Sequence, residues 1–146
     1  MNDEDLTPLP SLDAYISAFK AIEASITDNQ WTMLKFHHAA PARAVSPTTL
    51  GATVGYVDYR GANLHYGGLA AALCRELGLN HDYVKVGALV DFVWPNQGGN
   101  EDFLWIMRER VALALEELGW VPRVAGYLYP DLALRELQSQ VAAEAH

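Results

Sequence analysis

The sequence has 146 residues, of which 51% are hydrophobic and 19% charged, and its formal net charge at pH 7 is −8. This length suits one domain with a single core, and the apolar content excludes a chain that is disordered throughout. Taken over the whole chain, a charge of −8 argues against nucleic-acid binding, because phosphate contacts require basic surface. The longest apolar run, 84–94, is interrupted by Lys85 and Asp91 and is far shorter than the roughly 20 residues of a membrane span, so we expect no membrane partner.

The first ten residues, MNDEDLTPLP, are acidic and contain two prolines. A secretory signal has the opposite order, basic and then apolar. We therefore expect residues 1–10 to be disordered, residues 11–146 to form a single globular domain, and the protein to be cytoplasmic. The single Cys74 cannot form a disulfide within the chain, and its helical neighbours predict a buried or half-buried thiol.

Charge is distributed unevenly along the chain. Residues 1–30 carry one basic and six acidic side chains, residues 31–90 carry five and three, and residues 91–146 carry four and nine. The centre is therefore the only part with a net positive charge, +2. It is the part of the sequence in which a contact with nucleic acid is most favourable.

Two helices are expected before the centre of the chain. Ser11 is a good N-cap for a first helix, in which apolar residues recur every three or four positions. These residues are Leu12, Tyr15, Ile16, Phe19, Ile22 and Ile26. Thr27 to Gln30 has the form of a capping box, so a second helix begins near Asp28 and ends before Pro41.

A pair of helices follows in the stretch 46–78. Ser46 and Pro47 suit the N-cap and first position of a short helix that ends near Gly55. A longer helix then runs from about Arg60 to Leu77 and is stopped by Gly78. A short helix, a glycine-containing turn and a longer helix are the outline of a helix-turn-helix.

The C-terminal third predicts a hairpin and two more helices. The β-branched and aromatic run 83–94 is a predicted strand, the turn signal NQGGN follows it, and 103–107 is a second strand. Helical spacing returns over 110–118, and a last helix begins at 130–131. The apolar stripe of this last helix would pack on the first helix or on a second copy of the chain, which would make a homodimer. The fold class expected is α+β, mostly helical, with a winged-helix-like helix pair followed by a short antiparallel β-hairpin.

The longer helix of the pair has two distinct sides at 100° per residue. Its core side is predicted to hold Ala62, Tyr66, Leu69, Ala70, Leu73 and Leu77, and its opposite side Arg60, Leu64, Gly67, Gly68, Ala71 and Arg75. Two adjacent glycines inside a helix cost roughly 1 kcal/mol each relative to alanine, and a close approach by another backbone would compensate for them. Arginines can donate to phosphate or guanine, and an asparagine can pair with adenine. The candidate nucleic-acid-binding residues are Arg43, Tyr59, Arg60, Asn63, Gly67 and Arg75.

No pattern in the sequence indicates catalysis, a metal or a cofactor. His37 and His38 are adjacent in a predicted helix and point about 100° apart, without ligand spacing to other residues, so each is expected to be a core or surface histidine. Glu116 and Glu117 are expected on a helix surface. The glycines of GYVDYRGANLHYGG follow no βαβ strand and precede no Lys-Ser or Lys-Thr pair, which excludes a phosphate loop. We therefore expect no enzymatic activity and no cofactor.

The stretch TLGATVGYVDYRGANLHYGGLAAAL, followed at a distance by WIMRERVALALEELGWV, resembles an accessory domain of bacterial HNH-type restriction endonucleases. The family pattern has a Val-Gly-Tyr, an Asn-Leu and a Tyr-Gly in the helix pair, here 54–56, 63–64 and 66–67. An HNH nuclease needs several histidines around its metal, whereas after His81 this chain has only His146. The resemblance, which covers about residues 30–121, implies a stand-alone DNA-reading accessory domain linked to restriction or phage defence, without the nuclease.

Three functional classes are open from the sequence. The first is a non-catalytic nucleic-acid-binding module with DNA as its partner. The second is an acidic protein-interaction module, such as an inhibitor of a nucleic-acid enzyme, for which the charge of −8 is favourable. The third is a small enzyme with a site on the Trp- and Tyr-rich surfaces.

Overall fold

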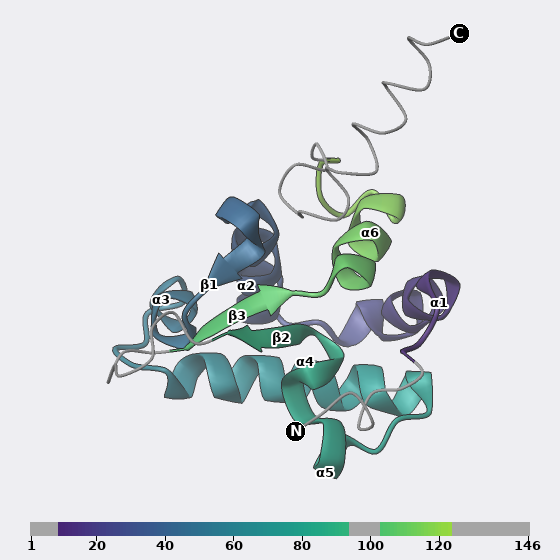
Figure 1. The fold of residues 1–146 in the computed structure, drawn as a ribbon, viewed down its shortest axis with the longest axis horizontal. Helices are drawn as coiled ribbons and strands as arrows, with labels where there is room; N and C mark the ends of the chain where they lie inside the picture. The colour runs from purple at the N-terminus through teal and green to yellow at the C-terminus, as the bar shows by residue number, and fades with distance from the viewer. Residues whose placement is uncertain (1–8, 94–102, 124–146) are drawn as a thin grey trace, which may run out of the picture.

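The computed structural model describes residues 9–93 and 103–123, and helices dominate them (Figure 1). The elements in chain order are α1 (Leu12–Ile22), η2 (Glu23–Ser25), α2 (Asp28–Ala39), η3 (Pro41–Arg43), β1 (Ala44–Val45), α3 (Pro47–Ala52), α4 (Arg60–Leu77), α5 (His81–Val84), η4 (Lys85–Ala88), β2 (Val90–Val93), β3 (Leu104–Met107) and α6 (Glu109–Glu117). The α+β, mostly helical class is therefore confirmed.

The helix boundaries are set by local capping, as the sequence predicts. The hydroxyls of Ser11 and Ser46 accept backbone N–H groups at the starts of α1 and α3. At α2 the hydroxyl of Thr27 accepts the Gln30 N–H at 3.1 Å, and the Gln30 side-chain oxygen accepts the Thr27 N–H at 2.9 Å, which completes the capping box. Gly78 ends α4 in the left-handed conformation, with φ 75°.

The three strands form one antiparallel sheet in the order β1-β3-β2. The predicted hairpin of β2 and β3 is confirmed, with Phe92 opposite Trp105. Its connection, including the predicted NQGGN turn and Trp94, lies outside the described residues. The sequence does not predict β1, which is two residues long and pairs Val45 with Trp105 on the other edge of β3.

The predicted strand over 83–94 is wrong in its first half. Residues 83–84 belong to α5 and residues 85–88 to η4, so the strand begins only at Val90. The Asn80 side chain accepts the Asp82 N–H at 2.9 Å and starts a helical turn, and the chain leaves this turn at Lys85 with φ 52°. The turn buries Val84 against Cys74 of α4. Tertiary packing has overridden a strand-like composition.

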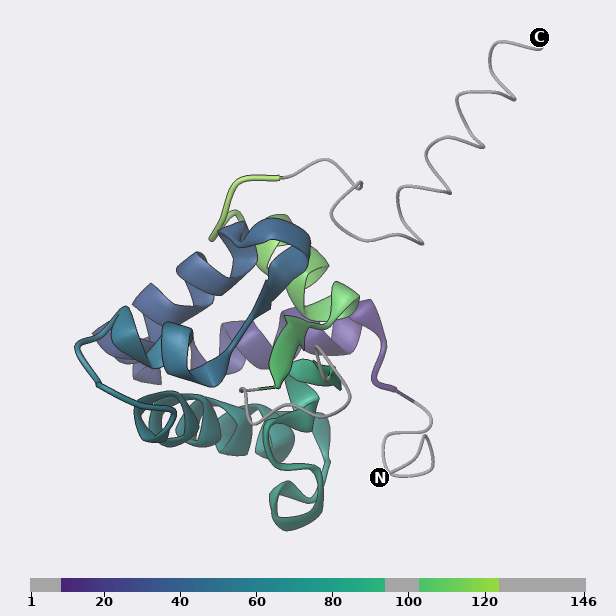
Figure 2. The ribbon, with the colours of Figure 1, turned by 60° about the vertical axis from the view of Figure 1, so that its left-hand side comes forward.

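The order α2, β1, α3, α4, β2, β3 is a winged-helix-like arrangement, because a helix pair is followed by a hairpin whose second strand pairs with a short strand before the pair. Figures 1 and 2 both place α4 along the lower side of the molecule and α6 on the upper side. Helix α1 packs against both α4 and α6. One side of α4 is therefore enclosed by the fold, and the other is left to solvent.

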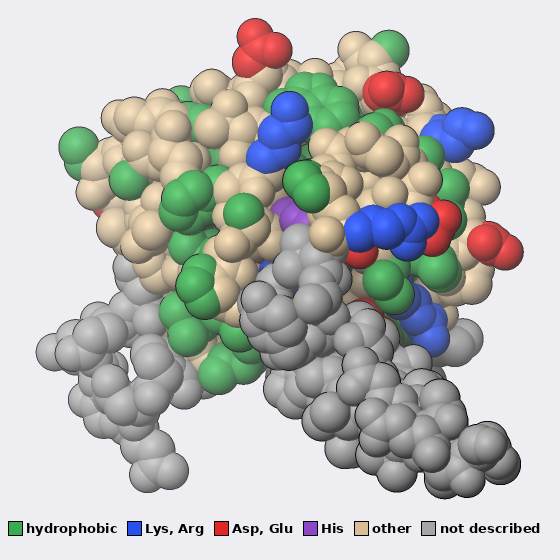
Figure 3. All heavy atoms as spheres, turned by 90° about the horizontal axis from the view of Figure 1, so that it is seen from above, with side chains coloured by type: hydrophobic (Ala, Val, Ile, Leu, Met, Phe, Trp, Pro, Cys, Tyr) green, Lys and Arg blue, Asp and Glu red, His purple; other side chains and the backbone are tan. Residues whose placement is uncertain are grey.

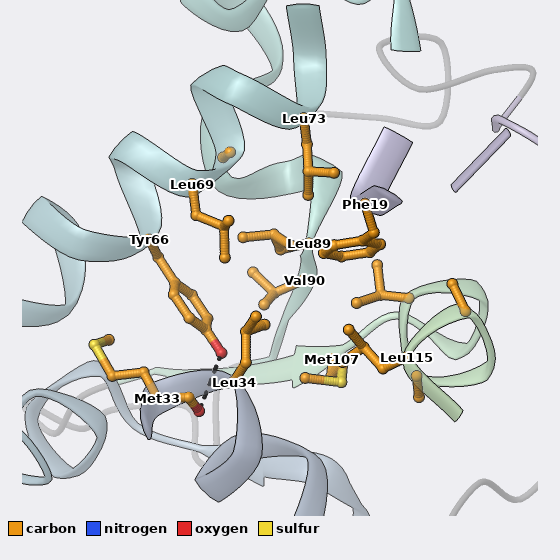
Figure 4. Packing of buried hydrophobic residues seen from close by; sticks show 14 of the residues in the cluster. Phe19, Met33, Leu34, Tyr66, Leu69, Leu73, Leu89, Val90, Met107 and Leu115 are labelled. Atoms are coloured by element: carbon orange, nitrogen blue, oxygen red, sulfur yellow. Dashed lines mark hydrogen bonds between the residues drawn. The ribbon is translucent and has the colours of Figure 1, made fainter. Parts of the chain in front are cut away.

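A main hydrophobic core joins α1, α2, α4, the sheet and α6, and a small second cluster is formed by Cys74, Val84 and Ala88. Figure 4 shows Leu69 and Leu73 of α4 with Phe19 of α1, Leu89, and Leu115 of α6 around the sheet. The predicted core side of α4 is confirmed, since Ala62, Tyr66, Leu69, Ala70 and Leu73 are each at most 1% exposed and Leu77 is half-buried. Cys74 is also buried, as predicted.

Three sequence predictions fall outside the described residues. Of the predicted disordered segment 1–10, residues 1–8 are not described. The predicted last helix, with the dimer contact it would offer, lies within residues 124–146. Among the residues that are described, none of the helices has the length and apolar character needed to cross a membrane.

Candidate nucleic-acid interface

The solvent side of α4 carries three of the six predicted site residues, Arg60, Gly67 and Arg75. We call this side the α4 strip, and it consists of Arg60, Leu64, Gly67, Gly68, Ala71 and Arg75. The two arginines and Gly68 are exposed, Leu64 is 62% exposed, and Gly67 and Ala71 are half-buried. The arginines are fifteen positions apart, which places them about 22 Å apart along the helix axis at 1.5 Å per residue. The strip is thus a narrow surface with small residues in its middle and an arginine at each end, and none of its six residues is acidic.

The start of the strip is held by Asp58. One carboxylate oxygen of Asp58 accepts the Arg60 backbone N–H at 2.9 Å, and the other lies 3.1 Å from the Arg60 guanidinium. The Arg60 side chain is nevertheless 79% exposed. A surface ion pair of this kind contributes little, so the guanidinium is able to exchange the carboxylate for a phosphate. Tyr59, 49% exposed, and the exposed Asn63 stand beside it, as the sequence predicts.

The turn between α3 and α4 depends on two glycines at positions where a larger side chain would not fit. A methyl group at Gly61 would overlap the ring of Tyr56, and one at Gly51 would lie 3.0 Å from the Asp58 carbonyl oxygen. Small residues at 51 and 61 therefore let the turn fold tightly over the start of α4. This turn exposes Tyr56 and Val57, whose exposed fractions are 38% and 93%.

The adjacent glycines inside α4 have different surroundings. A methyl group at Gly68 would meet the Gln30 side-chain nitrogen at 3.4 Å, and this nitrogen donates to the His65 carbonyl at 3.1 Å. The close approach at Gly68 therefore comes from α2 of the same chain. Nothing lies within 4 Å of the corresponding position at Gly67, so this glycine leaves open surface in the middle of the strip.

Arg43 does not belong to the interface, and its prediction as a nucleic-acid contact is wrong. Its side chain is 1% exposed, and its guanidinium donates to a Glu116 carboxylate oxygen at 3.0 Å. The same oxygen lies 2.8 Å from the ring nitrogen Nε2 of His38. Glu116 is only 7% exposed, so its predicted place on a helix surface is also wrong. These three residues form a buried ionic cluster that joins α2, η3 and α6.

A second buried network surrounds His37. The Nε2–H of His37 donates to the carbonyls of Arg43 and Trp105 at 3.0 and 2.9 Å, so Nδ1 accepts the Tyr66 hydroxyl at 2.9 Å. Burial lowers the pKa of His37 to about 4, and the imidazole is neutral at pH 7. Burial also lowers the pKa of His38. The expectation that both histidines are core or surface residues is resolved in favour of the core.

Within the residues that the structure describes, no group of three or more His, Cys, Asp or Glu side chains is placed to hold a metal ion. Burial raises the pKa of the Cys74 thiol, which disfavours the thiolate that a nucleophile requires.

Two surface hollows in the described part of the chain have no α4 residue in their linings. One, of about 450 Å³, is lined by Asp28, Trp31, Thr32, Lys35 and Trp120. The other, of about 530 Å³, is lined by residues of α1, β2 and α6. In the larger hollow the Tyr15 hydroxyl donates to the Ala88 carbonyl at 2.7 Å and Arg108 is paired with Asp91 at 3.1 Å, so these groups stabilise the fold.

The charge on the upper face differs from that on the strip. Figure 3 views the molecule from above, and on that face the Lys and Arg side chains stand singly, interspersed with Asp and Glu. Such a mixed surface disfavours an extended contact with a polyanion. Helix α4, which carries the strip, runs along the lower side of the fold (Figure 1).

The periodicity of α4 places Leu64 on the solvent side, yet the sequence gives no reason to count it among the binding residues. Its exposed fraction of 62% is the signal, and this fraction is known only once the surrounding elements are in place. Comparisons with models of protein families, with curated proteins and with solved structures give no match for this chain.

Proposed function

We propose that this chain is a non-catalytic, winged-helix-like module that binds duplex DNA through the α4 strip. The observation that carries the proposal is the charge of this strip: in a chain with net charge −8, it is bounded by Arg60 and Arg75, and none of its six residues is acidic. The exposed pair of Arg60 with Asp58 contributes little and can give way to a phosphate. The resemblance to accessory domains of restriction endonucleases favours the same ligand. A cytoplasmic location and a role in restriction or phage defence belong to this proposal.

The dimensions of α4 suit a major groove. The groove is about 12 Å wide and admits an α-helix, and the phosphates line its two edges. Glycine and alanine in the middle of the strip keep the helix thin where the bases would lie. The arginines at its two ends would then reach phosphates on either side, as position-setting contacts.

Binding to duplex DNA at low salt tests the proposal, with a labelled 20-base-pair duplex and fluorescence anisotropy. We expect Arg60→Ala with Arg75→Ala to weaken binding and to reduce the slope of log K against log[salt] by about 2, since each phosphate contact contributes about 0.9. The matched control removes two exposed cations from other elements, Lys20→Ala with Arg123→Ala. Absence of binding to the duplex, or equal slopes for the two double variants, would refute the proposal.

A protein partner is the second candidate, and one observation favours it. The turn from α3 to α4 exposes Val57 (93%) and Tyr56 (38%), and Leu64 of α4 is 62% exposed. Exposed apolar groups of this kind are common in protein interfaces. If duplex binding is absent and Val57→Asp abolishes capture of one defined protein while Phe36→Asp on α2 does not, this second candidate replaces the first.

A further inference from the structure

We infer that helix α4 reads A·T base pairs, with Leu64 of the α4 strip packing on the C5-methyl group of thymine and Asn63, the residue before it, pairing with adenine. This inference rests on the proposed binding of duplex DNA and specifies which bases the same surface selects. It assigns base readout to two residues of α4 and backbone contact to the arginines at its ends.

Leu64 is the only long apolar side chain on the strip. It is 62% exposed, and the residues that follow it on the same side are Gly67, Gly68 and Ala71, none of which extends beyond a methyl group. The Leu64 side chain therefore extends further from the helix axis than the side chains that follow it on the strip. In a major groove the apolar group it can meet is the methyl of thymine, since the other base edges present hydrogen-bonding atoms.

Asn63 supplies the complementary polar contact. It is exposed, adjacent to Leu64 in the first half of α4, and its side-chain amide makes no hydrogen bond to the rest of the described chain. A free amide offers one acceptor and two donors, and adenine presents N7 as an acceptor and N6 as a donor. One Asn can therefore bind one adenine through two hydrogen bonds, next to the thymine methyl that Leu64 would cover.

The middle of the strip contains no residue of the type that reads guanine. Guanine is read chiefly by Arg or Lys, and the two arginines lie at the ends of the strip, about 22 Å apart at 1.5 Å per residue. The exposed residues between Arg60 and Arg75 are Asn63, Leu64 and Gly68, one amide, one leucine and one glycine, and this set is suited to A·T pairs.

The test compares three labelled duplexes of equal length: one rich in A·T pairs, the same duplex with uracil replacing thymine, and one rich in G·C pairs. Uracil differs from thymine only by lacking the methyl group. The ratio of the dissociation constants for the uracil and thymine duplexes therefore measures the proposed contact between Leu64 and this methyl group. We expect wild-type protein to bind the thymine duplex about fourfold more tightly for each methyl covered, from the usual value of burying one such group. Leu64→Ala should bring this ratio to about 1, while the control Phe36→Ala, at a 42% exposed site on α2, should keep it.

Asn63→Ala tests the adenine contact separately. We expect it to lower the preference for the A·T duplex over the G·C duplex by about tenfold, within the range of one bidentate pair, and to leave the thymine-to-uracil ratio unchanged. Equal affinity for the thymine and uracil duplexes, with binding retained, would overturn this inference and leave the proposed function standing. Absence of binding to all three duplexes would overturn both.

Discussion

Acid should destabilise this fold through His37. The imidazole is fully buried, its Nε2–H donates to two carbonyls, and its Nδ1 accepts the hydroxyl of Tyr66. A second proton on the ring would put a charge in the core and a donor against the Tyr66 hydroxyl, which would have to turn its own proton elsewhere. This is why burial holds the pKa of His37 at about 4 instead of 6.5.

The size of the effect follows from that difference in pKa. Between pH 6.5 and pH 4 the unfolded chain binds a proton at His37 and the folded chain does not, so acid favours unfolding. The stability is fully present above pH 6.5 and is lost as the pH falls towards 4. At 1.36 kcal/mol per pKa unit the loss is about 3 kcal/mol, a large share of the 5 to 15 kcal/mol that stabilise a typical domain. The lowered pKa of His38 acts in the same direction.

Urea unfolding followed by tryptophan fluorescence measures this loss, because Trp105 is buried and stacks on Tyr66. We expect wild-type protein to lose about 3 kcal/mol more than His37→Gln between pH 7 and pH 4, since glutamine does not titrate. His65→Gln, at a histidine whose hydrogen bond lies at the surface, should follow the wild type. Parallel pH profiles for wild type and His37→Gln would refute the assignment.

Three further substitutions test other parts of the structure by the same urea assay. Gly61→Ala should destabilise by about 1 to 3 kcal/mol, because the added methyl overlaps the ring of Tyr56, and an unchanged midpoint would contradict this packing. Thr27→Ala should cost about 1 kcal/mol through loss of the capping box, unless water replaces the hydroxyl at no cost. Glu116→Ala should cost about 3 to 5 kcal/mol because it leaves Arg43 buried without this carboxylate, and a value near zero would show that the pair contributes nothing.

The parts of the fold that depend on neighbouring residues could be predicted from the sequence. The capping box involves two residues only three positions apart, and the left-handed Gly78 acts on the turn immediately before it. The two sides of α4 follow from a helical period that the sequence displays over 18 residues. In each case the interaction that decides the structure lies within one or two turns.

The incorrect or missing structure predictions concern segments whose conformation is determined by contacts with residues far away in the sequence. The strand-like run at 83–94 contains a helical turn because Val84 packs on Cys74 of another helix. The strand β1 is only two residues long and exists because β3, about 60 residues later, pairs with it. A segment of two residues is too short to show the alternating pattern from which a strand is predicted.

Arg43 shows the same limit at the candidate site. An arginine in a proline-containing loop has the local features of an exposed residue, and Glu116, which holds it in the core, lies 73 positions away. Arg60 and Arg75 were placed correctly because the periodicity of their own helix decides their exposure. Candidate binding residues on a regular helix are therefore more predictable than those on a loop.

The inner side of α4 contributes to the stability of the fold, whereas its outer side is the proposed binding surface. Tyr66 on its inner side bonds His37, which also holds the carbonyls of Arg43 and Trp105, so a shift of α4 would break contacts to α2 and to the sheet. On its outer side Asp58 pairs with Arg60 at the surface, and Gln30 of α2 lies close to Gly68. Substitutions of exposed strip residues should therefore change binding and leave the unfolding midpoint nearly constant. Loss of DNA binding in such a variant, at unchanged stability, then reports on the contact itself.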